Sequence, residues 1–356
     1  MSGLTHKFKY RFYPTVKAAV KVAQGYLTRR RMPLYASLFI TQRCNLKCIY
    51  CFPNSPARKE TDIPLDKLFG IIDALYAAGT RFITILGGEP MLRDDFGEIV
   101  DYITGKGMLA EVSTNGYFIK RWPKAIQKLF LVCNSIDGDE KTHDTNRGRG
   151  SFKKVMESIE FCRKRHVPVQ LRSVITRNNI NNLQFMLDLA KRLGTTLSLG
   201  EQCVDPQRNP YEASSAEYRA FWEFIKQKKK AGHLIDKSYT CLNNIIKYPL
   251  DVPLNKIFIE DEALPPSMPP DMPKCTIRNG FCLLDNDGMM YPCIPLFGKW
   301  GKNVSELGVQ GAWEGLLEHK CRFCRSSVYD MKSFFFGLDF SSMTDMARYM
   351  YNKNSQ

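Results

Sequence analysis

Three closely spaced cysteines are the residues of this sequence best suited to chemistry. Cys44, Cys48 and Cys51 stand in the run Thr-Gln-Arg-Cys-Asn-Leu-Lys-Cys-Ile-Tyr-Cys-Phe, directly after an apolar, strand-like stretch. Such thiolates can bind three irons of a four-iron cluster and leave the fourth iron open to a substrate or cofactor. Zinc is the alternative metal, but structural zinc usually takes four ligands, and no fourth Cys or His lies nearby before Cys133.

Polar residues follow several of the later strand-like segments. A β-branched run ends in Gly87-Gly88-Glu89-Pro90, where the glycines would let the backbone approach a ligand and Glu89 would supply a carboxylate. Other polar side chains stand at the ends of three further segments: Ser113 and Asn115, Ser135 and Asp137, and Arg172. Each of these alone is more often a turn or cap residue, so their order along the chain is the stronger argument.

Taken in this order, the segments resemble the motifs of the radical S-adenosylmethionine (SAM) superfamily. The resemblance rests on the CxxxCxxC motif with Tyr50 before its third cysteine, the Gly-Gly-Glu-Pro run, Thr114-Asn115-Gly116, and Ser135-Ile-Asp137-Gly with the later His143-Asp144 and Arg147-Gly148. It implies that Gly87, Gly88, Glu89 and Pro90 hold the amino group of SAM. It also implies that Ser113 and Asn115 lie near its methionyl or ribose groups, that Ser135 and Asp137 are polar neighbours, and that Arg172 binds its carboxylate.

The resemblance also implies an activity. A [4Fe-4S] cluster on the three cysteines would bind SAM at its open iron, and reductive cleavage would give a 5′-deoxyadenosyl radical that abstracts a substrate hydrogen. A donor of the flavodoxin or ferredoxin type would supply the electron. We expect a peptide or protein substrate first, and a small or lipid-linked metabolite as the alternative. A chain that uses its clusters only for electron transfer is the non-enzyme alternative.

The order of strands and helices predicts the fold. Strands are expected near residues 35–41, 81–86, 109–114, 130–136, 168–175 and 195–200, and helices near 65–78, 95–106, 120–128, 151–165 and 181–193. Repeated β-α units predict a parallel sheet with its chemistry at the strands' C-terminal ends. The resemblance implies an incomplete (β/α)6 TIM-like barrel over residues 35–230. An open Rossmann-like sheet is the alternative, although no GxGxxG follows the first strand.

A second group of cysteines lies near the C-terminus. It comprises Cys275, Cys282, Cys293, Cys321 and Cys324, with an Asp-Asn-Asp-Gly hairpin turn at residues 285–288. The stretch resembles the auxiliary-cluster region of the SPASM and twitch subfamilies, which implies a small α+β domain with one [4Fe-4S] cluster held by Cys275, Cys293, Cys321 and Cys324. Cys282 is a spare thiol that could replace Cys275. Zinc competes, since four thiolates that include a CxxC also suit structural zinc.

The N-terminal segment is strongly basic. Twelve Lys and Arg residues precede Glu60, the first acidic residue, and the chain carries a formal net charge of +15. Val16, Ala19, Val20, Ala23 and Leu27 recur at helical spacing, with Lys17, Lys21 and Gln24 on another face. We expect a helix that packs on the barrel with its basic side in solvent. The alternative is a surface helix that contacts anionic lipid.

These observations divide the chain into four segments. We expect a basic amphipathic segment at 1–34, the barrel at 35–230, a linker region at 231–274 and the auxiliary-cluster domain at 275–356. Clustered thiols in a large chain without a secretory signal favour metal sites in the cytoplasm, with peripheral contact at the inner membrane face as an option. Nucleic acid is the weakest partner, because no RNA-binding motif accompanies the basic charge.

Overall fold

The computed structural model describes residues 6–51, 62–201, 213–252, 257–259, 263–324, 326 and 344. Strands and helices alternate over the first two thirds of the chain: α2 Tyr13–Leu27, β1 Tyr35–Phe39, α3 Leu65–Ala78, β2 Phe82–Leu86, α4 Phe96–Gly105, β3 Leu109–Thr114, α5 Pro123–Lys128, β4 Leu131–Ser135, α6 Glu140–Arg147, α7 Ser151–Arg163, β5 Val169–Ile175, α8 Leu183–Leu193 and β6 Leu197–Glu201. The predicted strands of the barrel are all confirmed, to within about two residues at each end.

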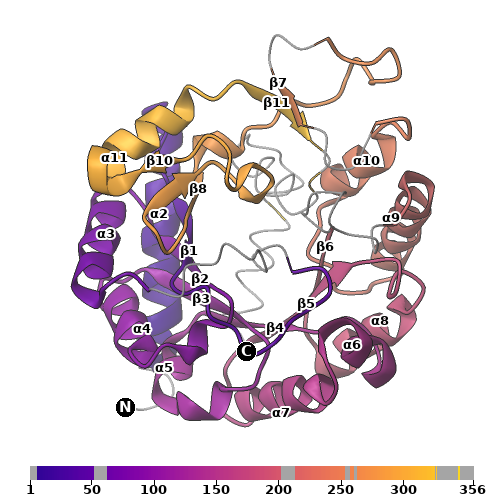
Figure 1. The fold of residues 1–356 in the computed structure, drawn as a ribbon, viewed down its shortest axis with the longest axis horizontal. Helices are drawn as coiled ribbons and strands as arrows, with labels where there is room; N and C mark the ends of the chain where they lie inside the picture. Colours follow the sequence, from indigo (N-terminus) through magenta and orange to yellow (C-terminus); the bar gives the residue numbers. More distant parts are fainter. Residues whose placement is uncertain are drawn as a thin grey trace.

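Strands β1 to β6 are parallel and neighbours in one curved sheet, whose order is β10-β9-β8-β1-β2-β3-β4-β5-β6. Figure 1 shows helices α3 to α9 around the outside of this arc. The incomplete barrel predicted from the sequence is therefore confirmed. Helix α3 illustrates the local cause: Leu68, Ile72 and Leu75 recur on one face and are buried against the sheet, and Gly79, with φ 123°, ends the helix.

The remaining elements follow the barrel. They are α9 Ser215–Lys230, α10 Tyr239–Lys247, β7 Ile257–Ile259, β8 Phe281–Leu284, β9 Met289–Tyr291, β10 Lys302–Asn303, α11 Val304–Leu317 and β11 Cys321–Cys324. The predicted hairpin joins β8 to β9, and Gly288 takes the positive φ (86°) of its turn. Strand β8 also pairs in parallel with β1. The sequence did not predict that this hairpin would continue the barrel sheet.

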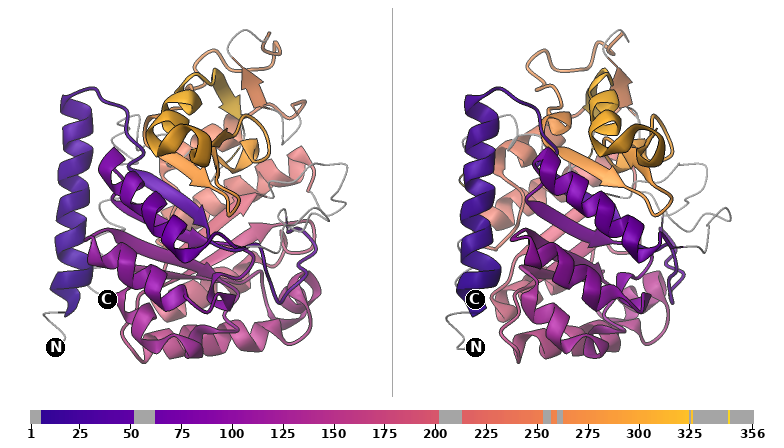
Figure 2. Two further views of the ribbon diagram at one scale, coloured as in Figure 1. Left: turned by 60° about the vertical axis from the view of Figure 1, so that its left-hand side comes forward. Right: turned by 90° about the vertical axis from the view of Figure 1, so that its left-hand side faces the viewer.

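Helix α2 lies across the N-terminal ends of the strands. Lys17 Nζ donates to Tyr76 Oη at 3.0 Å and to the carbonyl of Lys106 at 3.3 Å, just before β3. Arg11, in the helical turn that precedes α2, is buried and donates to the carbonyl of His166, just before β5. Figure 2 shows α2 standing along one side of the molecule.

The face that α2 turns inward corrects the sequence prediction. The helix does pack on the barrel, but Lys17 and Lys21 are on the inner side, and the apolar stripe faces solvent: Val16 is 44% exposed and Val20 63%. Long lysine stems can cover apolar surface while their ammonium groups reach carbonyls and hydroxyls at the strand ends. Across the described ranges, every helix falls short of the length and apolarity that crossing a bilayer requires.

Candidate active site

The loop that carries Cys44, Cys48 and Cys51 leaves the C-terminal end of β1 and runs beside the loop that leaves β2. The Ile40 amide donates to the Leu86 carbonyl at 3.0 Å, the Gly88 amide to Thr41 at 2.9 Å, and the Glu89 amide to Arg43 at 2.8 Å. The two loops thus continue the pairing of their strands. They set the first cysteine at the edge where barrel folds place their chemistry.

The glycines of the Gly-Gly-Glu-Pro run make this pairing possible. A Cβ on Gly87 would lie 2.6 Å from the Thr41 carbonyl oxygen, and one on Gly88 would lie 2.3 Å from that of Arg43. These distances are too short for any side chain, and the obstruction is backbone. In this structure the glycines admit the protein's own cysteine loop, and the close approach of a ligand to this backbone stays a prediction.

Glu89 joins this loop to the next strand end. Its carboxylate accepts hydrogen bonds from Thr114 Oγ1 at 2.8 Å, the Asn115 amide at 2.8 Å and the Met91 amide at 3.3 Å. The side chain is buried, and burial raises its pKa to about 7 although these donors oppose the shift. Glu89 thereby ties the loop after β2 to the C-terminal end of β3, and its binding to the amino group of SAM stays a prediction. Pro90 is buried and begins the turn that follows.

Asn115 contacts the cysteine loop directly. Its side-chain nitrogen donates to Asn45 Oδ1 at 2.9 Å and lies 3.9 Å from Cys44 Sγ. The Leu46 amide approaches the same sulfur at 3.4 Å. Two N–H groups therefore point at the Cys44 sulfur.

Asp137 is the centre of a buried network behind the second and third cysteines. It accepts a hydrogen bond from Tyr50 Oη at 2.5 Å and a two-pronged contact from Arg147, with Nε at 2.7 Å and the second nitrogen at 3.2 Å. Burial alone would raise the pKa of Asp137, but the Arg147 guanidinium brings it below its ordinary value. The Ile49 amide also donates to the Asn146 carbonyl at 3.0 Å. Asp137 and Tyr50, which the sequence proposed as neighbours of SAM, here fasten the cysteine loop to α6.

The motif residues His143 and Asp144 of α6 also make local contacts. His143 Nδ1 accepts a hydrogen bond from the Asp137 amide at 3.1 Å, and burial lowers the pKa of His143 to about 4. Asp144 accepts from the amides of Gly150 at 2.5 Å and Phe152 at 2.8 Å, at the start of α7. The family motif identifies these positions in the sequence. It does not assign these roles, because the hydrogen-bonding partners are distant in the chain or are backbone groups.

Ser113, Ser135 and Arg172 lie on the inward face of the sheet. Both serines are half-buried near the C-terminal ends of β3 and β4, and Ser135 is the register partner of Arg172. One terminal nitrogen of Arg172 lies 3.6 Å from Glu111 Oε1 and donates a hydrogen bond to Gln170 Oε1 at 3.3 Å. A ligand carboxylate would have to compete with Glu111 for this guanidinium.

The three cysteines of the loop are partly exposed. The Cys51 amide donates to the Cys48 carbonyl at 3.1 Å, which forms a tight turn between the last two. Burial raises the pKa of Cys48, and the Arg147 charge opposes that shift. Within the described residues, no three His, Cys, Asp or Glu side chains form a ready-made metal site. The donor set nevertheless suits an iron–sulfur cluster: three accessible thiols on one short loop.

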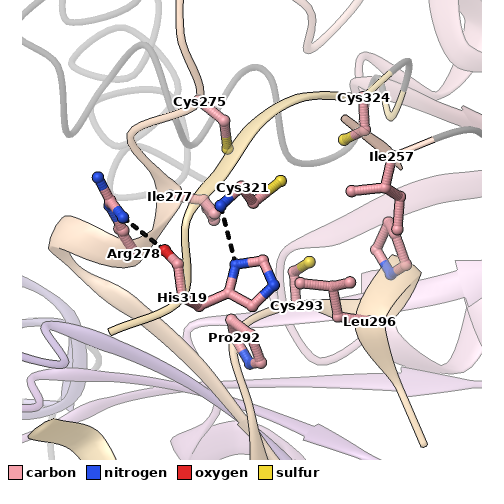
Figure 3. A pocket seen from close by; sticks show the side chains of 11 residues that line it. Ile257, Cys275, Ile277, Arg278, Pro292, Cys293, Leu296, His319, Cys321 and Cys324 are labelled. Atoms are coloured by element: carbon pink, nitrogen blue, oxygen red, sulfur yellow. Dashed lines mark hydrogen bonds between the residues drawn. The ribbon is translucent and has the colours of Figure 1, made fainter. Parts of the chain in front are cut away.

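Four C-terminal cysteines line one pocket. Figure 3 shows the sulfurs of Cys275, Cys293, Cys321 and Cys324 directed toward a common space, with His319 and Arg278 beside them. The pairing of β11 with β7 and a hydrogen bond from the Cys275 amide to the Arg322 carbonyl, 2.7 Å, bring the separate segments together. His319 Nδ1 accepts from the Cys321 amide at 3.0 Å and fixes the start of β11.

The fifth cysteine of this group lies elsewhere. Cys282 is on β8 opposite Ala36 of β1 and belongs to the main hydrophobic core, where burial raises its pKa to about 12. Cys275 lines the pocket that Cys282 does not reach. Of the two alternatives left open by the sequence, the geometry therefore favours Cys275.

Comparison with known proteins agrees with the site. Residues 38–190 match the family model described as the radical SAM superfamily. Residues 38–190 of the chain therefore form a radical SAM domain. The chain is 26% identical to the AdoMet-dependent heme synthase of Methanosarcina barkeri over 82% of this chain and 90% of that protein. It is 32% identical to the mycofactocin maturase MftC of Mycolicibacterium smegmatis over 47% of this chain and 44% of that protein, so it spans less than half of the maturase.

A solved structure shares the fold of this chain. SuiB of Streptococcus suis, crystallised with its precursor peptide SuiA, superposes with a TM-score of 0.62 at 16% identity, over 85% of this chain and 69% of SuiB. At this level of identity the likeness concerns architecture alone. The family and the barrel predicted from the sequence are thus both confirmed.

Proposed function

We propose that Cys44, Cys48 and Cys51 hold a [4Fe-4S] cluster with one iron open to SAM. The observation that carries the proposal is the way the cysteine loop is fixed: Gly87 and Gly88 admit it beside β2, and Asp137 anchors it through Tyr50. A cluster bound by three thiols needs such a frame, since the fourth coordination site must face a defined space.

The residues around the loop divide into two groups by what they do. Glu89, Asn115, Asp137 and Tyr50 position the loop through the hydrogen bonds described above. The backbone at 87–90, together with Ser113, Ser135 and Arg172 on the inward face, would contact SAM itself. Glu111 holds Arg172 in place until a carboxylate competes for it.

When bound, the cluster and SAM supply a 5′-deoxyadenosyl radical that abstracts a hydrogen atom from the substrate. The protein's part is to orient SAM, to exclude water and to admit the substrate at the open end of the strands. A low-potential donor of the flavodoxin or ferredoxin type would provide the electron. Such a donor, if acidic, would be attracted by a chain of net charge +15.

The pocket of Cys275, Cys293, Cys321 and Cys324 would hold one auxiliary [4Fe-4S] cluster. Its four thiols leave no open iron for substrate, so its role would be electron transfer or structural support. A single zinc ion is the competing occupant.

We place a peptide or protein first among substrates. Two comparisons support this assignment: the resemblance in sequence to the maturase MftC and the fold shared with SuiB, which was crystallised with a precursor peptide. The basic charge of the chain also suits an acidic peptide.

A metabolite is the second candidate, because the match that extends over most of both chains is to a heme synthase. A tetrapyrrole or another anionic cofactor precursor would equally suit the basic charge. Anaerobic reconstitution with iron and sulfide, followed by SAM and dithionite, tests both ideas. We expect 5′-deoxyadenosine to form slowly with SAM alone and several-fold faster with the true substrate class. No acceleration by any peptide encoded beside the gene, but acceleration by a tetrapyrrole, would replace the first candidate by the second.

A further inference from the structure

The outer face of α2 is a continuous apolar stripe. It consists of Val16, Ala19, Val20, Ala23 and Leu27, which recur one turn apart and are all exposed. Val16 is 44% exposed, Val20 63% and Leu27 86%, and Tyr13 at the start of the helix is 49% exposed. Single apolar residues are common on protein surfaces, but an aligned row along one whole helix marks an interaction site.

The opposite face of α2 packs on the barrel. Ala18 packs on the small cluster of Leu109, Phe130, Leu131 and Cys133 at the bottom of the sheet. Lys17 bonds to Tyr76 and to the backbone before β3, and Gly25 lies against Met32. The helix therefore cannot rotate to bury its stripe without losing these contacts.

Exposed positive charges stand at both ends of the stripe. Lys9 precedes it, and Arg29, Arg30 and Arg31 follow it directly; all four side chains are exposed. No acidic residue occurs before Glu60. A helix with an apolar stripe and basic ends has the composition that binds in the interface of an anionic bilayer, where apolar burial and charge attraction add.

A second copy of the chain fits this surface less well. Two stripes packed antiparallel would bring Lys9 of one copy near Arg29–Arg31 of the other, and parallel packing would bring the arginines together. Either arrangement opposes like charges. A helix face with small Ala and Val side chains is also convex, which suits the deformable surface of lipid better than a rigid protein groove.

We propose that α2 seats this protein on an anionic lipid surface, with the stripe in the headgroup–acyl boundary and Lys9 and Arg29–Arg31 on lipid phosphates. This develops the lipid contact that the sequence left as an alternative, and it has a geometric consequence. The stripe faces away from the N-terminal ends of the strands, whereas Cys44 lies at their C-terminal ends. A membrane on α2 would leave the mouth of the barrel open to water, so a soluble substrate and electron donor could enter.

Vesicle flotation with the full-length protein tests this proposal. Vesicles of phosphatidylcholine alone are compared with vesicles that also contain about one third phosphatidylglycerol. We expect strong binding only to the anionic vesicles, a loss of tenfold or more in Val20→Glu/Leu27→Glu, and a similar loss in Arg29→Gln/Arg30→Gln/Arg31→Gln. Leu307→Glu is the matched control, since Leu307 is an exposed leucine on α11, 50% accessible, and should bind like the wild type.

Several outcomes would overturn the proposal. They are equal binding of all four proteins, no binding by the wild type, or a wild-type dimer in light scattering that Val20→Glu/Leu27→Glu converts to monomer. A fall of more than a few degrees in the melting temperature of Val20→Glu/Leu27→Glu would show that the chain itself covers the stripe, which would also exclude a lipid contact. Flotation needs neither iron nor SAM, so its result is independent of the proposed radical chemistry.

Discussion

At the scale of single residues, the polar groups of the family motifs mainly bind one another. Glu89 accepts backbone and hydroxyl donors, and Asp137 accepts Tyr50 and Arg147, all of them buried contacts. A buried carboxylate needs such partners, because an unpaired one is costly to bury. These residues therefore hold the cysteine loop in place, and in the proposed site SAM would contact backbone atoms at 87–90 together with Ser113, Ser135 and Arg172.

The two glycines offer the sharpest residue-level prediction. Gly88→Ala forces a Cβ to within 2.3 Å of a carbonyl oxygen. We expect it to lower the stability of the apo protein by about 1–3 kcal/mol and to reduce iron uptake at the cysteine loop. Thermal unfolding and iron content after reconstitution measure the two effects.

Gly70→Ala is the matched control for this substitution. Gly70 lies on the exposed face of α3 with open space around it. Alanine there should raise stability by about 0.5–1 kcal/mol through helix propensity and leave iron uptake unchanged. If Gly88→Ala behaved like Gly70→Ala, the close approach of the two loops would not matter.

His143 gives the molecule a pH dependence whose sign follows from its pKa. The pKa of His143 is about 4 in the folded protein, whereas an unperturbed histidine has a pKa of 6.5. Between these two pH values the unfolded chain therefore binds a proton at this residue that the folded chain does not. The stabilisation is complete above about pH 6.5 and is lost as the pH falls toward 4. As the pH falls from about 7 to about 5, the titration of His143 should lower the free energy of unfolding by about 2 kcal/mol.

His143→Asn isolates this contribution. The Asn oxygen can accept the hydrogen bond from the Asp137 amide that Nδ1 now accepts, but it does not titrate. In urea unfolding of the apo proteins, the wild type should lose about 2 kcal/mol more than the variant over that pH range. If the free energy of unfolding fell equally with pH in the two proteins, His143 would be charged, or free to be charged, in the folded state.

At the scale of elements, the sequence predicted what depends on local pattern. The six barrel strands and helices α3, α4, α5, α7 and α8 were predicted because apolar periodicity and strand-end motifs are local signals, whereas the short, polar α6 was not. The pairing of β8 with β1 was not predicted either, since it joins residues about 245 apart and no local pattern encodes a partner in parallel pairing. The inward face of α2 was predicted wrongly for a similar reason. An apolar stripe normally faces the core, whereas here groups at the strand ends bind the lysine side and the stripe faces solvent.

The auxiliary pocket supplies the prediction at this scale. Cys275→Ser should remove one ligand and lower the iron content from roughly eight to roughly four per chain, with the loss confined to the auxiliary cluster. Cys282→Ser, the matched control, should keep roughly eight irons. Loss of iron in Cys282→Ser alone would make Cys282 the ligand. One zinc and roughly four irons in the wild type would establish the zinc site instead.

At the scale of the whole molecule, the two ends of the barrel have separate tasks. The C-terminal edge of the strands carries the cysteine loop and the inward polar residues, and the N-terminal edge is closed by α2. This division agrees with barrel folds in general. Residues at the N-terminal ends of the strands (the bottom face) contribute to stability, and residues at the C-terminal ends (the top face) carry the chemistry. Here the bottom face would gain a further role, because its covering helix exposes an apolar stripe between basic ends.

The cysteine triad offers the most direct test of the proposed chemistry. Full-length protein, reconstituted anaerobically and loaded with iron, is mixed with SAM and dithionite, and 5′-deoxyadenosine is quantified beside Cys44→Ala/Cys48→Ala/Cys51→Ala. We expect 5′-deoxyadenosine from the wild type, none above background from the variant, and an intact auxiliary iron content in both. A wild type with a filled triad that forms no 5′-deoxyadenosine, or a variant that forms as much as the wild type, would contradict the proposed chemistry.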